Sequence, residues 1–372
     1  MKVGVIKLGA RISFNNKDTS GGNGEARSII KMLAEGGAEV HAYTKILKKD
    51  VLPEHVIWHN IEDEFENLSF DVLLVINGSV NFFGGAEDRA QILNYHIINK
   101  FKGPVFYAYC DPALLLKQIW PAMESKSWST SYNKEDIEIT RSDIVYISQP
   151  HDVARIGALI GGKSGVVVPS KIIHFPFEQF PCLNEQLPVN PSPIVDLSYG
   201  GTMRGGKRVI KMIKYYFGYD SDISVEMFGK IARDEFDDKF LTGIETFPKF
   251  TGTVNYDAML PKMNEAMCHI VIGDPLYERI NDMAQRAYES IWSNVITFID
   301  SDMDQLRRVY GKNKELSDFL YLSSKSEAQD KIRMIKHNPR VRMDVLADQL
   351  ATIKFNPTKY CEEFVDCLTE NL

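Results

Sequence analysis

The segment 194–217, IVDLSYGGTMRGGKRVIKMIKYYF, contains a complete strand–loop–helix unit and decides the fold class. Its first six residues form an apolar run typical of a β-strand, and a helix is expected from about residue 205 to 217. Between them, Gly200 and Gly201 let the backbone turn tightly. The helix is expected to face the core with Val209, Ile210, Met212, Ile213, Tyr216 and Phe217. Strand, glycine-rich turn and helix in this order predict a parallel α/β sheet.

The same rhythm of strand and helix continues on both sides of this segment. Apolar runs predict strands at 2–8, 38–44, 71–78, 103–110 and 142–148 before it, and at 224–229, 250–254, 268–274 and 294–300 after it. Helical spacing is found at 24–37, 87–101 and 282–293. The chain is therefore predicted to be an α/β protein made of two Rossmann-like, doubly wound domains that face each other across a cleft.

The domain boundaries follow from a proline-rich stretch. Residues 181–193, PCLNEQLPVNPSP, hold four prolines and predict a linker. It separates an N-terminal domain, 1–180, from a C-terminal domain, 194–337. Residues 338–372 are expected to form polar helices that pack back towards the N-terminal domain. Because ligands bind at the carboxyl ends of strands in such sheets, functional residues are expected directly after strands.

Composition narrows the class of protein. The formal net charge of −7 excludes a chain coated in basic residues, although a local basic groove remains compatible with it. The start, MKVGVIKLGA, indicates a strand rather than a signal peptide, and no stretch approaches the length of a membrane span. The five cysteines are scattered, which favours reduced thiols in a cytoplasm. Metal signals are poor, since His55 and His59 lack the glutamate of a zinc motif.

The segment 198–208 fits an anion-binding site. Unpaired N–H groups and the positive dipole end of a helix attract anions, and Arg204 and Arg208 lie four apart, on one helix face. Cations at a helix N-terminus are unfavourable unless an anion accompanies them, so a phosphate is favoured. The alternative is that these side chains merely solvate a surface helix.

Other candidates carry weaker signals. Asp111 follows a strand, where it fits a general base, yet Asp-Pro also opens ordinary turns. Glu25 begins the first helix, at the mouth of the expected cleft. On spacing alone, Arg286 and Glu289 favour a surface ion pair over a nucleotide contact.

Two loop features complete the survey. The aromatic loop NGSVNFFGG, 77–85, fits equally a base-stacking element and a core plug. The Asp-Ser-Asp triplets at 220–222 and 300–302 are interpreted as solvated turns.

Together these motifs resemble the DNA β-glucosyltransferases of T-even-type bacteriophages, which glucosylate 5-hydroxymethylcytosine in duplex DNA. The matching segments run in the same order along the chain. They are the first strand with Gly9, NGSVNFFGG, the aspartate after FYAYC, QIWPAMESKSW, YISQ, HFPFEQF, SYGGTMRGGKR, MFG, FTGTV, VIGDPLY, RAYE and ITFID. The resemblance implies a fold of the GT-B kind, with a UDP-sugar, most readily UDP-glucose, held by the C-terminal domain.

The resemblance also assigns roles. It makes Asp111 the base of an inverting transfer, and it places Glu25 and Gly9 at the sugar or acceptor. It places UDP against Gly201, Thr202, Arg204, Arg208, Val254, Tyr277, Arg286 and Glu289. It brings Asn81, Phe82 and Phe83 to the DNA where the target base is flipped out. It further implies Mg²⁺ held weakly on the diphosphate, a monomer, and action in the cytoplasm of an infected bacterial host.

Departures from the family leave the specificity open. An arginine of the family is missing from Asp111-Pro112-Ala113, the loop at 10–24 differs in length, and one extra residue lies between Asp274 and Arg286. The sugar is therefore glucose or another, such as arabinose, and the acceptor is hydroxymethylcytosine or hydroxymethyluracil. The rival functions are a GT-B enzyme with a carbohydrate, lipid or small-molecule acceptor, and a two-lobed sugar-binding protein.

Overall fold

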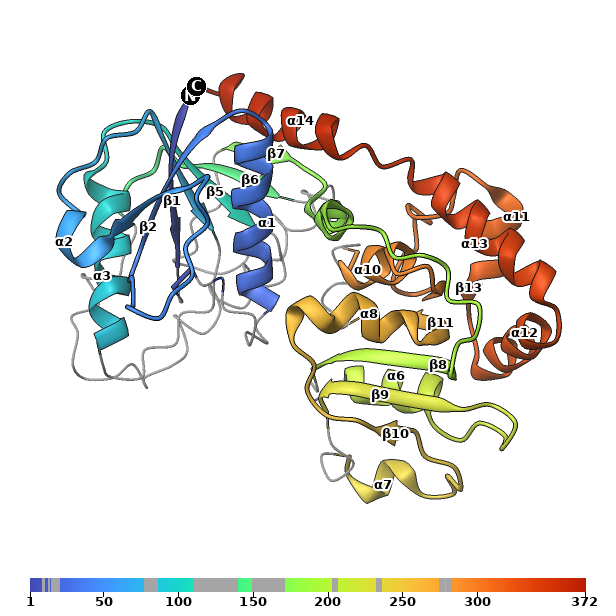
Figure 1. The fold of residues 1–372 in the computed structure, drawn as a ribbon. Helices are drawn as coiled ribbons and strands as arrows, with labels where there is room; N and C mark the ends of the chain where they lie inside the picture. The colour runs from blue at the N-terminus through green and yellow to red at the C-terminus, as the bar shows by residue number, and fades with distance from the viewer. Residues whose placement is uncertain are drawn as a thin grey trace. The chain divides into compact units, whose positions relative to one another are not determined.

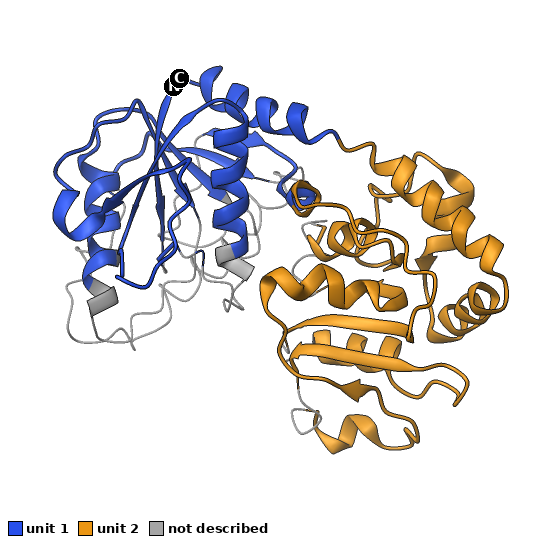
Figure 2. Ribbon diagram, in the orientation of Figure 1, with its two compact units in different colours: residues 1–180, 356–372 blue, residues 181–355 orange. Residues whose placement is uncertain are grey.

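The structure is a computed structural model of the 372-residue chain, and it divides into two compact units (Figure 2). Unit 1 comprises residues 1–180 and 356–372, and unit 2 comprises residues 181–355. The residues that the structure describes are 1–8, 11–12, 14, 21–76, 86–109, 140–148, 171–202, 207–231, 236–273, 278 and 283–372.

Unit 1 is built on a seven-stranded sheet with the order β3-β2-β1-β4-β5-β6-β7, in which every described pairing is parallel (Figure 1). The strands are β1 (Lys2–Lys7), β2 (Glu39–Thr44), β3 (Ile57–Asn60), β4 (Val72–Ile76), β5 (Val105–Tyr109), β6 (Val145–Ser148) and β7 (Lys171–His174). The helices are α1 (Gly21–Glu35), α2 (Ile61–Glu64), α3 (Ala86–Lys100) and α14 (Pro357–Thr369). The central strands are buried along almost their whole length, as expected for parallel strands covered on both faces.

Unit 2 has a six-stranded sheet with the order β10-β9-β8-β11-β12-β13, again with parallel pairings. Its strands are β8 (Val195–Thr202), β9 (Val225–Lys230), β10 (Lys249–Phe250), β11 (Ala266–Val271), β12 (Ile296–Asp300) and β13 (Tyr321–Leu322). Its helices are α6 (Lys207–Tyr216), α7 (Asp238–Leu241), α8 (Met259–Asn264), α10 (Arg286–Trp292), α11 (Lys314–Leu320), α12 (Lys325–His337) and α13 (Pro339–Ile353). Two 3₁₀ turns, η2 (Phe177–Leu183) and η4 (Tyr256–Ala258), complete the described elements. The prediction of two doubly wound α/β domains is confirmed by these two sheets.

The C-terminal segment differs from the expectation. Residues 338–372 do not act as one segment, because α13 belongs to unit 2 and only α14 belongs to unit 1. Gln349 on α13 accepts a hydrogen bond from the backbone N–H of Thr297 and donates one to the carbonyl of Val295. The α14 helix packs on α1 so closely that a Cβ on Gly36 would lie 2.5 Å from the carbonyl oxygen of Cys361. Both chain ends therefore belong to unit 1, where they lie side by side (Figure 1).

The chain passes from unit 1 to unit 2 at Phe180–Pro181, so the proline-rich stretch is part of unit 2. There the N–H of Leu187 bonds to the carbonyl of Trp292, and Asn190 bonds to the carbonyl of Asn264. Within the described part of the chain, no helix is long and apolar enough to cross a membrane.

Candidate donor site of unit 2

Strand β8 contains Gly200 and Gly201 near its carboxyl end. Contrary to the prediction, the backbone does not turn at Gly200 and Gly201, because β8 continues to Thr202 and pairs with β9 along its length. Gly229 on β9 lies opposite Gly201, and a Cβ there would lie 1.8 Å from the carbonyl oxygen of Gly201. The φ of Gly229, 115°, is also one that glycine favours. A side chain at position 229 would therefore not fit opposite Gly201.

The segment after β10 joins the same edge of the sheet. The N–H of Gly229 donates to the carbonyl of Gly252 over 2.7 Å. Val254, two residues further on, packs against a small cluster of Phe228, Met263 and Val295. The structure thereby brings Gly201, Thr202 and the region of Val254 to the carboxyl ends of β8 and β9, where a ligand is expected.

Helix α6 begins at Lys207, so Arg208 lies in its first turn. The Arg208 guanidinium donates to the hydroxyl of Tyr199 over 2.8 Å, and its Nε atom is buried without a hydrogen-bond partner among the described residues. Ile210 is the exception to the predicted core face, since it is 51 % exposed, whereas Tyr215, which the pattern missed, is fully buried. Arg204 and Tyr277 lie outside the described residues.

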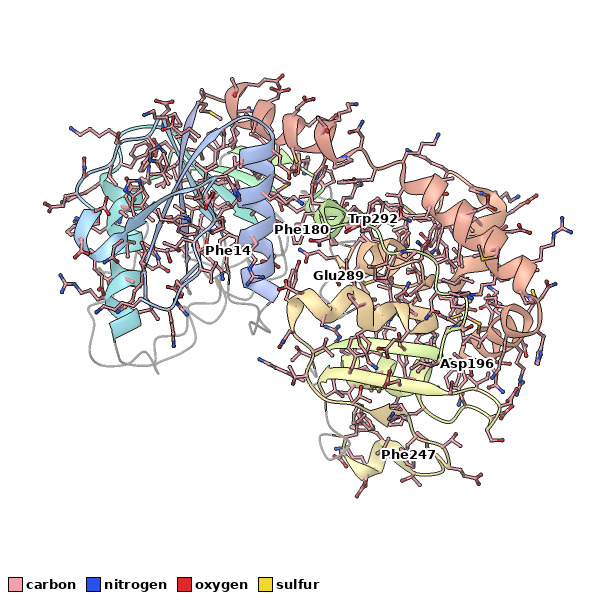
Figure 3. All side chains as sticks on the ribbon, in the orientation of Figure 1. Phe14, Phe180, Asp196, Phe247, Glu289 and Trp292 are labelled. Carbon is pink, nitrogen blue, oxygen red and sulfur yellow. The ribbon has the colours of Figure 1, made fainter. Side chains whose placement is uncertain are left out.

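Arg286 and Glu289 form the ion pair that their spacing predicted, with Nη1 and Oε2 2.7 Å apart. The expected surface location is wrong, because the Glu289 side chain is only 9 % exposed and that of Arg286 23 % (Figure 3 labels Glu289 on α10). Arg286 also lies 3.8 Å from the sulfur of Met263. A pair so largely removed from water differs from a solvated surface pair, because water screens its charges poorly.

His269 on β11 was not among the residues predicted from the sequence, and it lies within range of the Arg286 charge. His269 is fully buried, and neither ring nitrogen has a hydrogen-bond partner among the described residues. Burial, followed by the positive charge of Arg286, lowers the pKa of His269 from 6.5 to about 3. The imidazole is therefore neutral at physiological pH.

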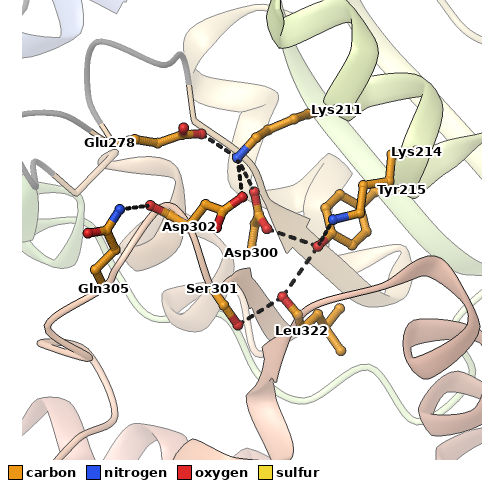
Figure 4. A network of polar contacts seen from close by, with 9 residues as sticks. All are labelled: Lys211, Lys214, Tyr215, Glu278, Asp300, Ser301, Asp302, Gln305 and Leu322. Carbon is orange, nitrogen blue, oxygen red and sulfur yellow. Dashed lines mark hydrogen bonds and ion pairs between the residues drawn. The ribbon is translucent and has the colours of Figure 1, made fainter.

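A second missed cluster surrounds Lys211 of α6 (Figure 4). Its ammonium group forms ion pairs with Glu278 and Asp300, and it lies 3.4 Å from Asp302. Asp300 ends β12, is 1 % exposed and also accepts a hydrogen bond from the hydroxyl of Tyr215 over 2.9 Å. The interpretation of 300–302 as a solvated turn is therefore wrong for Asp300, although its position at the carboxyl end of a predicted strand was a signal for it.

The triplet 220–222 is exposed to solvent, as predicted. Asp220 and Asp222 are exposed, and both bind the guanidinium of Arg333 on α12. The same Asp-Ser-Asp triplet thus forms a solvent-exposed turn at 220–222, whereas at 300–302 its first aspartate is a buried ion-pair partner.

Unit 1 contributes one described candidate, Glu25. The helix α1 begins at Gly21, inside the predicted loop, so the half-buried Glu25 lies in its second turn and not at its start. The other unit 1 candidates, Gly9, Asn81, Phe82, Phe83 and Asp111, lie outside the described residues.

The histidines near 55–59 have a local structural role. His59 stacks on Tyr43 with ring centroids 4.4 Å apart, lies 3.0 Å from a ring nitrogen of His41 and pairs with Glu64. In the described part of the chain, no group of three His, Cys, Asp or Glu side chains is placed to hold a metal ion.

Two Rossmann-like sheets in one chain form the architecture that GT-B glycosyltransferases have. The family model "Bacteriophage T4 beta-glucosyltransferase" matches residues 1–181. The chain is 27 % identical over 352 residues to the DNA β-glucosyltransferase of Enterobacteria phage T4, covering 94 % of this chain and 93 % of that protein. The predicted resemblance is confirmed, since the chain is similar to the bacteriophage T4 β-glucosyltransferase over nearly its whole length.

Solved structures agree with this relationship at the level of the fold. A mutant of the phage T4 β-glucosyltransferase in complex with UDP-glucose superposes with a TM-score of 0.77 at 23 % identity, covering 99 % of each chain. The same phage T4 enzyme in complex with UDP and Mn²⁺ gives a TM-score of 0.77, also at 23 % identity and 99 % coverage of both chains.

Proposed function

We propose that the chain is an inverting, UDP-sugar-dependent DNA glycosyltransferase, with glucose as the first candidate sugar. It transfers the sugar to the hydroxymethyl group of 5-hydroxymethylcytosine in duplex DNA. The observation that carries the proposal is the 27 % identity, over 94 % of the chain, to a DNA β-glucosyltransferase. The cations at the carboxyl edge of unit 2 support a nucleotide diphosphate as the ligand there.

On the donor side, Gly201 and Thr202 provide backbone close to the diphosphate, and Arg208 with Arg204 neutralises its charge. The leaving UDP gains negative charge as the glycosidic bond to it breaks, so fixed guanidinium groups lower the barrier. Glu289 accepts hydrogen bonds from the ribose hydroxyls while its partner Arg286 contacts phosphate. Val254 and Tyr277 complete the nucleotide pocket.

On the acceptor side, Asp111 removes the proton of the acceptor hydroxyl, which then attacks the anomeric carbon in line with the departing UDP. Glu25 and Gly9 hold the sugar or the acceptor. A base within a duplex has to leave the stack to reach an active site, and Asn81, Phe82 and Phe83 are proposed to support the flipped state.

A divalent ion enters the proposal only through the donor. The described residues contain no metal cage, so Mg²⁺ would be bound mainly by the diphosphate oxygens, a ligand set that suits this ion. No step assigned to the residues above depends on it.

The test is mass spectrometry of DNA after incubation with a panel of UDP-sugars. Duplexes containing hydroxymethylcytosine, hydroxymethyluracil or unmodified cytosine serve as acceptors. We expect the mass of one hexose on hydroxymethylcytosine with UDP-glucose. A pentose adduct, or reaction with hydroxymethyluracil alone, would correct the sugar or the base, and absence of any DNA adduct would refute the proposal.

Two variants test the assigned roles. Asp111→Asn should abolish transfer while UDP binding, measured by calorimetry, stays unchanged. Phe83→Ala should lower transfer to duplex DNA more than transfer to a single strand, where no base has to be flipped. Equal losses on both substrates would contradict the role of the loop.

A further inference from the structure

We propose that Lys211, three residues from Arg208 on α6, is a positioning residue for the donor diphosphate, whose binding it favours by compensating the carboxylates of Glu278 and Asp300. This inference rests on the proposed function, because it concerns how the same site accepts UDP. The proposed function gives no nucleotide contact to Lys211, Glu278 or Asp300. Lys211 acts through the charge around the site.

The carboxylates form a concentrated negative charge at the end of β12. Glu278 is 17 % exposed and Asp300 is 1 % exposed, so water screens them poorly, whereas Asp302 is open to solvent. Asp300 has one further donor, the hydroxyl of Tyr215. Lys211 is the cation that both partly buried carboxylates share.

The Lys211 ammonium is firmly charged. Burial alone would lower its pKa, but the hydrogen bonds and charges of Asp300 and Glu278 outweigh burial and raise the pKa. The side chain is therefore a permanent positive charge, fixed between the end of β12 and helix α6 (Figure 4).

Arg208 and Lys211 lie three residues apart on α6, which places them on one face of the helix. In the described part of the chain, Arg208 bonds to Tyr199 and pairs with no carboxylate. Because Lys211 is the cation paired with Glu278 and Asp300, Arg208 remains available to bind an anion. Without Lys211, the carboxylates would attract Arg208 and repel the diphosphate.

The residues of this cluster are far apart in the sequence, so the cluster forms only in the folded chain. Lys211 meets Glu278 across 67 residues and Asp300 across 89 residues. The cluster therefore joins three parts of unit 2 that are far apart in the sequence, and the proposed charge balance at Arg208 depends on all of them.

The experiment measures binding of UDP and of uridine to the full chain by calorimetry. Lys211→Met should weaken UDP binding about tenfold, or about 1.4 kcal/mol, and leave uridine binding unchanged, because uridine carries no phosphate. Lys239→Met is the control. Lys239 lies on α7 of the same unit, is exposed and pairs only with the exposed Asp237 among the described carboxylates, so its loss should leave both affinities unchanged.

Two further variants separate charge from structure. Lys211→Met with Asp300→Asn removes both charges of the buried pair and should restore most of the UDP affinity, even if Lys211→Met alone folds poorly. Glu278→Gln leaves Lys211 in place with one carboxylate fewer, so it should tighten UDP binding. A purely structural ion pair would give the opposite result, since losing it could only weaken the site.

The outcomes are distinguishable. Equal losses for UDP and uridine in Lys211→Met, or weaker UDP binding in Glu278→Gln, would overturn the role of Lys211. Failure of the double variant to regain affinity would do the same. If wild-type protein binds no UDP at all, the proposed function itself fails, together with this inference.

Discussion

Acidification should destabilise unit 2 through His269. Its pKa is about 3 in the folded chain, because of burial and then Arg286, against 6.5 for the unperturbed group. The unfolded chain therefore binds a proton on this residue between these two pH values, whereas the folded chain does not. The resulting stability is fully present above pH 6.5 and is lost progressively as the pH falls towards 3. Between pH 7.5 and pH 5.0 the loss is about 2 kcal/mol from this residue alone.

The change to test is His269→Leu. Leucine replaces the buried ring with an apolar side chain that cannot bind a proton. We expect the variant to lose about 2 kcal/mol less than wild type over the same pH interval. The assay is urea unfolding at pH 7.5 and 5.0, followed by hydrogen exchange of peptides covering Ala266–Val271. This strand belongs to unit 2 and reports its unfolding separately from that of unit 1.

His337→Gln is the control, because His337 is exposed at the end of α12 and should give the wild-type pH dependence. The reasoning is refuted if wild type and His269→Leu lose the same free energy of unfolding between the two pH values. That result would mean that His269 is protonated in the folded chain or reaches water.

Three further changes test the packing that supports the site. Gly229→Ala should lower the free energy of unfolding of unit 2, measured by urea denaturation, by at least about 2 kcal/mol, because its Cβ would overlap the carbonyl of Gly201 at a positive φ. Tyr360→Phe, which removes the bond to the carbonyl of Pro176, should cost about 1 kcal/mol in unit 1, measured by exchange protection of α14. Arg333→Ala should leave the urea midpoint of unit 2 unchanged, because its ion pairs with two aspartates are exposed to solvent; a clear drop would show that they anchor α12.

The longer strands could be predicted because a parallel strand covered on both faces has to be apolar throughout. The runs in β1 and β4 show this directly. Short edge strands carry no such signal. β3 and β7 have four residues each and are only partly buried, so their sequences resemble loops. Pairing with a neighbouring strand, which is not encoded locally, makes them part of the sheet.

The candidate site shows the same division. Arg286 and Glu289 could be found from their spacing, but their burial depends on how α10 packs and was not predictable from four letters. The two Asp-Ser-Asp triplets make the point more sharply. Nothing in the triplet distinguishes Asp300 from Asp220, since the difference comes from Lys211, a partner 89 residues away. Long-range partners of this kind are fixed only by the fold.

Arg208 and Arg286, the described arginines of the candidate donor site, differ in what an arriving anion has to displace. Arg286 already has a carboxylate partner, Glu289, and an anion would have to share the guanidinium with it. Arg208 is held by the neutral hydroxyl of Tyr199, so a phosphate adds a charge-assisted bond without losing an ion pair. We therefore expect Arg208 to contribute more than Arg286 to the proposed binding of a diphosphate, since Arg286 also has to orient Glu289. The role proposed for Lys211 then bears on the stronger of the two contacts.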